Sequence, residues 1–414
     1  MPTQNHGETA SQPRVTIAVP AYRNPGLREC LKAIAAMDAT VPFETIVVLN
    51  DATAEVRAIA QDHAAGVRIA EMPVNLGVSG AFNQGFALGT GEFLLELQDD
   101  SIPDPDLISV LVARAEAEPD AGAVGALTVD EQGEVSDPGW IVWRDGVTSA
   151  GLVGGSRNPD HYVSCRAVDY HGSAGMLLRR SAWESVSGLD DSFYPAYYGD
   201  VDLCFRLRTR GWRVILEPRA RVQHAGSMST SPGFREFVAR RLREQFIDRH
   251  RRTLEHHGEF DPSPSAADAE LARAATAPRR PAPPPPTPDE RSRLRARLDV
   301  DALAIAKRER DVHAAYADHV RADAAAESEQ HTARIANLEH RVTEYEHRLT
   351  ETQQHLCATD DALQQARAEL DDTHTALQDA LRSLHQMSHS KSWRYTRWLR
   401  RVGDGPTRSD QPDT

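Results

Sequence analysis

The chain has 414 residues, of which 40% are hydrophobic and 26% are charged, enough for one large packed domain with additions or for two domains. Its formal net charge of −14 excludes broad, non-specific binding to nucleic acid, because a phosphate backbone repels an acidic surface. The four cysteines lie far apart and form no CxxC pair. This excludes a zinc knuckle and a disulfide framework and is typical of a reducing compartment.

Residues 1–13 lack the apolar stretch of a signal peptide, and we expect them to be disordered. No window of the sequence approaches the roughly 20 apolar residues that span a bilayer. We therefore expect a cytoplasmic protein, with peripheral contact at the inner face of the membrane if its C-terminal tail binds lipid.

Residues 14–260 alternate short apolar runs with helical segments. This alternation, with nearly continuous apolar strands, predicts an α/β fold whose mostly parallel sheet is covered on both faces. Ser79, after Gly77, is the expected N-cap of the third helix. The expected strands are 15–20, 43–50, 67–72 and 92–98, and the expected helices are 26–38, 54–64 and 79–88.

Sheets of this kind bind ligands at the carboxyl ends of their strands. Polar residues follow those ends here, and we expect a binding site among them. They are Tyr22 to Asn24, Asn50 with Asp51, and Asp99 to Ser101.

The composition changes after residue 260. Residues 261–290 are rich in proline and alanine and are expected to form a semi-rigid linker. In 291–390, apolar residues recur at every seventh position, which predicts a helical coiled coil. We expect this coiled coil to join copies of the chain, and pairing with a different protein is the alternative. The stripe consists of Ile335, Val342, Leu349, Leu356, Leu363, Leu370, Leu377 and Leu384.

Residues 391–414 form a basic and aromatic tail. Within 391–402, Tyr395 and Trp398 share one helical face and arginines cover the opposite face. This pattern is typical of a segment that lies in a membrane interface. The alternative is a short helix that docks on protein.

One apolar strand ends in Gln98, Asp99, Asp100 and Ser101, and Pro103 stops its extension. Carboxylates at a strand terminus can hold a hard divalent cation, which neutralises the charge developing on a diphosphate leaving group. The alternative is a polar turn in which Asp99 or Ser101 bonds nearby backbone N–H groups.

The stretch 197–206, YYGDVDLCFR, places two carboxylates at the start of an expected helix. Its apolar residues fit one buried face, and Gly211 is expected to end it. Asp200 then lies at the N-cap or in the first turn, where a helix favours the ionised form, and an ionised carboxylate can act as a general base. Asp202 faces elsewhere and has Arg206 at i+4.

Five stretches resemble, in order, the family 2 glycosyltransferases over residues 14 to about 230. They are VTIAVPAYRNPGLRECLKAI, IVVLNDAT, NLGVSGAFNQGF, LELQDDSIPDPDLI and the block 171–229. The last is the most specific, because it joins a glycine-containing strand, an acid pair, a helix, another strand and a histidine. The resemblance implies a nucleotide-binding α/β sandwich of the GT-A type, followed here by the Pro-rich linker and the coiled coil.

The resemblance also implies an inverting glycosyltransferase that moves a sugar from a UDP- or dTDP-linked donor to a hydroxyl of a cell-surface glycan or lipid-linked acceptor. Asp200 matches the family's base. Asp100 and His224 match positions that hold Mg²⁺ or Mn²⁺, and a histidine satisfied by hydrogen bonds beneath the cleft is the alternative for His224. The implied donor-side residues are Pro20, Tyr22, Asn24, Asn50, Asp51, Asn75 and Asp99; those on the acceptor side are Gly172, Gly199 and Asp202, with Asp202 in a supporting structural role.

Three residues depart from the family pattern. Gly199 stands where a glutamate is usual, Gln98 where the first acid of the metal motif is common, and Leu49 replaces an acid at the end of the second strand. A catalytically degenerate transferase domain that serves as a coiled-coil scaffold is therefore the alternative function. A sugar nucleotidyltransferase and a P-loop NTPase are disfavoured, because no GxGxR-type loop follows the first strand and no GxxxxGK[ST] loop is present.

Overall fold

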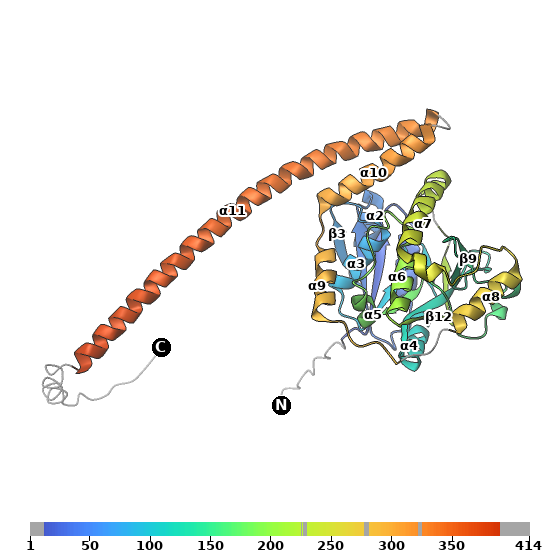
Figure 1. Cartoon of the computed structure of the whole chain (residues 1–414), viewed down its shortest axis with the longest axis horizontal. Coiled ribbons are helices and arrows are strands. Elements are labelled where there is room, and N and C mark those ends of the chain that lie inside the picture. The colour runs from blue at the N-terminus through green and yellow to red at the C-terminus, as the bar shows by residue number, and fades with distance from the viewer. Residues whose placement is uncertain (1–11, 225, 227–229, 277–280, 322–324, 390–414) are drawn as a thin grey trace, which may run out of the picture. The chain divides into compact units, whose positions relative to one another are not determined.

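The computed structural model describes residues 12–224, 226, 230–276, 281–321 and 325–389. It divides into two compact units, Met1–Val342 and Thr343–Thr414. The first unit holds all the strands and most of the helices (Figure 1). In the described residues, no helix is both long enough and apolar enough to cross a membrane.

Twelve strands and eleven α-helices are described, with two short 3₁₀ helices at Val153–Gly155 and Pro159–His161. The strands are β1 (Val15–Ala21), β2 (Phe43–Asn50), β3 (Arg68–Met72), β4 (Phe93–Glu96), β5 (Ser101–Pro103), β6 (Ala121–Val129), β7 (Val135–Asp137), β8 (Trp140–Val142), β9 (Thr148–Ala150), β10 (Arg166–Ala167), β11 (Met176–Arg179) and β12 (Arg213–His224). The helices are α1 (Leu27–Ala35), α2 (Ala54–Asp62), α3 (Gly77–Leu88), α4 (Leu107–Ala117), α5 (Arg180–Ser185), α6 (Gly199–Thr209), α7 (Pro232–Leu254), α8 (Pro264–Ala275), α9 (Pro288–Leu298), α10 (Ala302–Arg321) and α11 (Ala325–His389).

Ten of the described strands form one mixed sheet with the order β10-β12-β6-β11-β4-β1-β2-β3, in which β5 also pairs with β12 and β7 with β6. Strands β8 and β9 form a separate two-stranded sheet. The pairs β4–β1, β1–β2, β2–β3 and β12–β6 are parallel, whereas β11 runs antiparallel to both β4 and β6. The predicted α/β class with a mostly parallel sheet is therefore confirmed. Because β1, β2 and β4 are parallel, their carboxyl ends meet at the same edge of the sheet.

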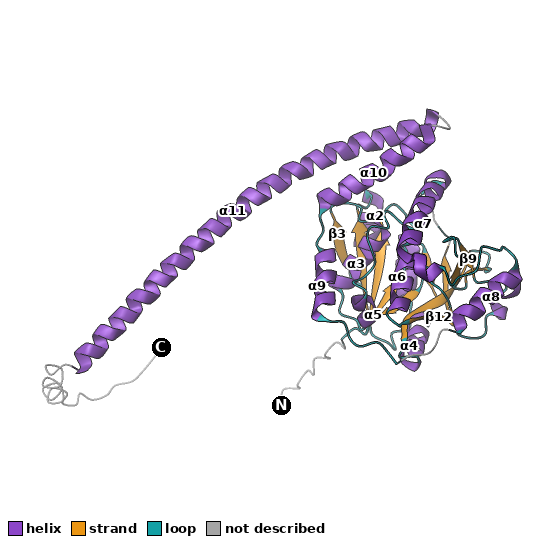
Figure 2. Ribbon diagram, in the orientation of Figure 1, coloured by secondary structure: helices purple, strands orange, loops and turns teal. Residues whose placement is uncertain are grey.

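Helices cover both faces of the sheet (Figure 2). Successive residues of β4 face opposite layers, as strand geometry requires: Leu94 packs in one apolar cluster, and Phe93 and Leu95 pack in the other. The first cluster includes α3, α5, α6 and α7, and the second includes α1, α2 and α4. This arrangement explains why the strands read as almost continuous apolar runs.

The third helix begins earlier than predicted. It starts at Gly77, so Ser79 lies inside α3 and is not its N-cap. Gly77 has φ +69, and a Cβ at this position would lie 2.7 Å from the Pro195 carbonyl oxygen. Both features require glycine, and a propensity argument based on Ser79 does not detect them.

Helices α8, α9 and α10 and the start of α11, up to Val342, belong to the first compact unit. Helix α9 contacts α3 and α5, and α10 contacts α7. The Gln84 side chain donates to the Leu298 carbonyl over 2.6 Å, and the His313 ring stacks on Phe234 with centroids 4.9 Å apart. We call residues 288–342 the C-terminal arm.

Helix α11 carries the seven-residue stripe, but the stripe is not uniform. Leu338 and Val342 are buried within the first unit, so they are not available to a partner helix. From Leu349 to Leu384 the stripe leucines are 46–70% exposed. The structure shows a long helix and not a coiled coil. The predicted membrane-binding tail, 391–402, lies outside the described residues.

A buried ionic cluster joins α6 to α7. The Asp202 carboxylate is fully buried and accepts from Arg206 Nε at 2.7 Å, from Arg249 at 3.0 Å and from His250 Nε2 at 2.8 Å. Burial alone would raise the pKa of Asp202, but Arg206, His250 and Arg249 hold it well below its usual value. The predicted Asp202–Arg206 pair is present.

We predict that Asp202→Ala lowers the free energy of unfolding by about 3–5 kcal/mol, because it leaves buried cationic partners without their counterion. Urea denaturation measures this change. Asp248→Ala is the matched control on α7, since its carboxylate is exposed and its loss costs about 0.5 kcal/mol or less. Equal effects of the two substitutions would contradict a stabilising role for the cluster.

Candidate active site

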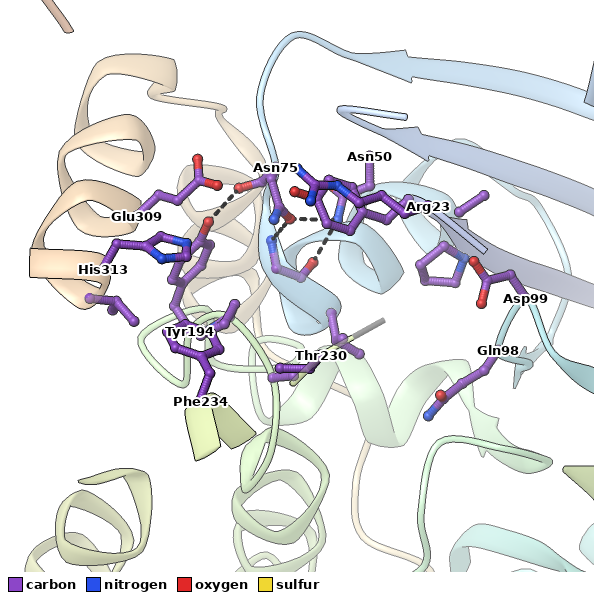
Figure 3. A pocket seen from close by; sticks show the side chains of 18 of the residues that line it. Arg23, Asn50, Asn75, Gln98, Asp99, Tyr194, Thr230, Phe234, Glu309 and His313 are labelled. Atoms are coloured by element: carbon purple, nitrogen blue, oxygen red, sulfur yellow. Dashed lines mark hydrogen bonds between the residues drawn. The ribbon is translucent and has the colours of Figure 1, made fainter. Parts of the chain in front are cut away.

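A cavity of about 480 Å³ lies at the carboxyl ends of β1, β2 and β4. Figure 3 shows Gln98 and Asp99 on one side of it and Glu309 and His313 on the other. The cavity brings together five of the seven predicted donor-side residues, Pro20, Tyr22, Asn50, Asn75 and Asp99.

The Asp99 carboxylate is held by the segment that follows β1. Asn24 donates to it over 3.3 Å, and the Tyr22 backbone N–H also bonds it. Burial, with the neighbouring Asp100 charge, raises the pKa of Asp99 to about 7. Asp99 lines the cavity, and Asn24 acts on the cavity through its hydrogen bond to Asp99.

Hydrogen bonds of the Asn50 and Asn75 side chains hold the loop before α3 in place. The Asn50 amide donates to Asn75 Oδ1 over 3.0 Å and to the Gly77 carbonyl over 3.3 Å, and its oxygen accepts from Leu76 N at 2.7 Å. Both side chains are buried. Their polar atoms are thus largely used in shaping the cavity wall, which leaves few of them for a ligand.

Asp51 lies immediately after β2 with φ 57, a conformation that aspartate tolerates better than most residues. Its carboxylate is 3.5 Å from the guanidinium of Arg341 in α11. The predicted donor-side residue is therefore next to the cavity and paired with a side chain 290 residues away in sequence. Leu49, which stands where the family often has an acid, is a buried core residue.

Asp100 and His224 meet at the other edge of the site. In the antiparallel pairing of β5 with β12, His224 lies opposite Ser101, and its Nε2 is 3.0 Å from Asp100 Oδ1. Neither atom has a hydrogen-bond partner among the described residues, and both atoms are buried. A carboxylate oxygen and an imidazole nitrogen that converge in this way fit a divalent cation such as Mn²⁺.

Gln98 contributes an amide where an acid is common. Its Nε2 donates to Ser173 Oγ over 2.8 Å, so the side chain ties the end of β4 to the turn 171–173. Gln98 thereby connects the predicted donor residues with the predicted acceptor residue Gly172.

A second acidic cluster, Asp169, His257 and Glu270, has donor atoms within 4.8 Å of one another but does not fit a metal. Arg208 and Arg273 occupy the Asp169 oxygens at 2.8 and 2.6 Å, and Arg273 also bonds Glu270. Although burial alone would raise the pKa of Asp169, the two guanidinium charges hold it below its usual value. Arginine charges thus balance the carboxylates of this cluster, and the ion pairs of Arg273 hold α8 to the rest of the domain.

Asp200 lies in the first turn of α6, as predicted. Its Oδ1 accepts from Val201 N at 2.9 Å. Burial raises the pKa of Asp200 to about 6, Val201 N–H opposes the shift, and the Asp137 charge adds to it. Tyr197 and Tyr198 precede it with φ 73 and φ 59, a left-handed conformation that costs about 1–3 kcal/mol per residue and often occurs at functional sites.

The surroundings of Asp200 include residues that sequence reasoning missed. Glu96, the last residue of β4, is fully buried, and neither of its carboxylate oxygens has a hydrogen-bond partner among the described residues. Burial raises the pKa of Glu96 well above its usual value, and the Asp200 charge adds to the shift. An acid within an otherwise apolar strand was the available signal. Asp137 and His171 also act on Asp200.

The two glycines expected on the acceptor side are positioned by close packing. Gly172 N donates to Asp137 Oδ2 over 3.1 Å, and a Cβ at 172 would lie 2.7 Å from that oxygen. A Cβ at Gly199 would collide with Ser79 Oγ. The Ser79 hydroxyl thus occupies the space that a side chain at 199 would enter. Asp202 is committed to its buried ion pairs.

Known proteins are similar to the part of the chain that contains most of this site. The sequence profile of glycosyl transferase family 2 matches residues 16–184. A Mycobacterium tuberculosis protein described as N-acetylglucosaminyl-diphospho-decaprenol L-rhamnosyltransferase is 30% identical over 236 residues, which cover 50% of this chain and 76% of that protein. The chain belongs to glycosyl transferase family 2. The predicted family and the predicted enzyme class, a glycosyltransferase, are thereby confirmed.

The transferase has more distant relatives. The O-antigen biosynthesis protein RfbC of Myxococcus xanthus is 28% identical over 228 residues, covering 52% of this chain and 18% of RfbC. The chain spans about a fifth of the length of its longer curated relatives. The mannosyltransferase PcManGT from Pyrobaculum calidifontis, solved in complex with GDP-Man and Mn²⁺, aligns over 81% of this chain and 84% of its own with a TM-score of 0.43 and 16% identity.

We predict that Asp100→Asn and His224→Ala each weaken Mn²⁺ binding about tenfold or more in the presence of inorganic pyrophosphate, because each removes a converging donor. Titration followed by electron paramagnetic resonance measures the affinity. Glu270→Gln is the matched control in the arginine-neutralised cluster and should leave Mn²⁺ binding unchanged. The reverse pattern would place the cation at the second cluster.

Proposed function

We propose that this protein is an inverting glycosyltransferase that moves a sugar from a nucleoside-diphosphate donor, UDP- or dTDP-linked, to a hydroxyl of a lipid-linked or cell-surface glycan acceptor. Family membership supports the sugar transfer. The lipid-linked acceptor named for the mycobacterial relative supports that acceptor class. The observation that carries the proposal is the location of Asp200, a carboxylate of raised pKa at the start of α6. It lies near Glu96, the last residue of the strand that leads to Asp99 and Asp100.

Asp200 is the proposed general base. It accepts the acceptor hydroxyl proton as that oxygen attacks the anomeric carbon from the face opposite the diphosphate, which inverts the configuration. The ionised form is required for this step. A base whose pKa lies near the working pH has the best balance between being ionised and holding the proton.

Asp100 and His224 are the residues that would hold Mg²⁺ or Mn²⁺, and the bound cation would supply charge neutralisation for the leaving diphosphate. Asp99 is held close to them by Asn24. Tyr22, Asn50, Asn75 and Pro20 shape the cavity for the nucleotide, and Asp51 lies at its margin.

We predict that Asp200→Asn lowers sugar transfer by at least about a hundredfold while the affinity for UDP or dTDP, measured by calorimetry, stays within about twofold. In the unaltered enzyme, kcat/KM falls about tenfold for each pH unit below 6, because the base becomes protonated. The residual activity of Asp200→Asn should not show this fall of kcat/KM below pH 6.

An equal loss of nucleotide affinity in Asp200→Asn would place this residue in the donor pocket and refute the assignment. Absence of UDP, dTDP and GDP binding by the unaltered protein at millimolar concentration would refute the donor proposal itself. A degenerate scaffold would show neither nucleotide binding nor transfer.

We also propose that the exposed leucine stripe of α11 joins copies of the chain. The leucines from 349 to 384 repeat every seven residues and are exposed. A strict seven-residue apolar repeat favours a left-handed coiled coil, and identical helices share that repeat in register. The membrane contact proposed for 391–402 would add to this association and would be tested by flotation with anionic liposomes.

We predict that the purified protein is an oligomer by light scattering and that Leu363→Asp dissociates it, because a charge then enters the apolar seam. Ala368→Asp is the matched control, since residue 368 lies on the opposite face of the helix. A monomer in the unaltered protein, or equal effects of the two substitutions, would contradict self-association through this stripe.

A further inference from the structure

The cavity at the strand ends is not closed by the family domain alone. Glu309, Val312 and His313 of α10 and Arg334 of α11 line it, and all four lie beyond residues 16–184, where the family profile matches. Figure 3 shows Glu309 and His313 facing the same space as Asn75 and Tyr194. The C-terminal arm therefore contributes one wall of the donor pocket.

The arm is fixed by several independent contacts, so its side chains have defined positions. His313 stacks on Phe234 at 4.9 Å, and Tyr316 packs edge-on against the same ring at 5.0 Å. Arg308 donates to the Asp191 carbonyl over 2.7 Å. These contacts tie α10 to α7 and to the loop before α6.

Arg334 and Glu309 are the charged arm residues that line the cavity, and they form an ion pair. The Arg334 side chain is 22% exposed, whereas that of Glu309 is only 3% exposed. One Glu309 oxygen is buried without a hydrogen-bond partner among the described residues. The Glu309 carboxylate thus orients the guanidinium, and the N–H groups of Arg334 that Glu309 does not occupy are available to the cavity that Arg334 lines.

Arg334 lines the pocket together with Tyr22, one of the donor-side residues that the family resemblance implies. Burial raises the pKa of the Tyr22 phenol, and the Arg23 and Arg334 charges oppose the shift. Arg341, two turns further along α11, pairs with Asp51 after β2. The converging pair Asp100 and His224, proposed to hold the diphosphate through the cation, is not among the residues that line the cavity with Arg334.

We propose that Arg334, positioned by Glu309, is a donor-specificity residue that contacts the nucleobase of the sugar nucleotide. This inference rests on the proposed donor site. A guanidinium donates hydrogen bonds and accepts none, so it matches the carbonyl oxygens of uracil, thymine or guanine, and adenine offers no such oxygen. The wall that selects the donor base is thereby supplied by a segment outside the family domain.

The test uses the full chain and measures the affinity for UDP, dTDP, ADP and Mn²⁺-pyrophosphate by calorimetry. We expect the neutral double variant Glu309→Gln/Arg334→Gln to lose about 10- to 100-fold in affinity for UDP or dTDP, the range for a hydrogen bond from a charged group. Its affinity for Mn²⁺-pyrophosphate should stay unchanged, and the preference for UDP over ADP should disappear. Arg321→Gln, an exposed arginine of α10, is the matched control.

A charge-exchanged variant separates recognition from stability. Glu309→Arg/Arg334→Glu keeps an ion pair between the two helices, so a merely structural role would restore both the melting temperature and the UDP affinity. We expect the melting temperature to recover and the affinity to remain low.

Three outcomes overturn the proposal. Unchanged UDP affinity in the neutral double variant shows that Arg334 does not contact the donor. Equal loss for Mn²⁺-pyrophosphate assigns Arg334 to the diphosphate. Absence of any nucleotide binding in the unaltered protein refutes the donor site and this role together, which distinguishes it from the first two outcomes.

Discussion

The antiparallel pairing of β5 with β12 is the constraint on which the site depends. It sets His224 opposite Ser101 and so brings an imidazole to Asp100, although the two lie 124 positions apart in the chain. The pairing of β4 with β1 and β11 separately sets the end of the apolar strand, with Glu96 beside Asp200 and Asp99 in the cavity. A shift of one residue in the β5–β12 register would turn His224 to the other face of the sheet and away from Asp100.

The molecule treats its buried acids in two different ways. Asp169 and Asp202 are each surrounded by arginines and histidine, so their charge is balanced and they hold helices in place. Among the described residues, no arginine forms an ion pair with Glu96, Asp99 or Asp200, and burial raises the pKa of each. Unbalanced carboxylates of this kind cluster at functional sites.

The sheet and its first helices could be predicted because buried strands leave apolar runs that a single sequence displays. The start of α3 could not, since it depends on the approach of Pro195 to Gly77. Asp100, Asp99 and Asp200 were accessible through the family motifs, whereas Glu309 and Arg334 were not. These two residues reach the cavity only because the arm packs against the family domain. No local sequence pattern indicates a contact between residues that lie more than 200 positions apart. The seven-residue stripe likewise did not show that Leu338 and Val342 are buried within the first unit.

The contact between Ser79 and Gly199 joins the start of α6 to α3. A Cβ at 199 would collide with Ser79 Oγ but would lie 3.7 Å from Ser79 Cβ, an ordinary van der Waals distance. The obstacle to a side chain at 199 is therefore one hydroxyl group and not the backbone of α3. Rotation of the Ser79 side chain, or an alanine at 79, removes it, so the start of α6 can accept a larger residue without rebuilding either helix.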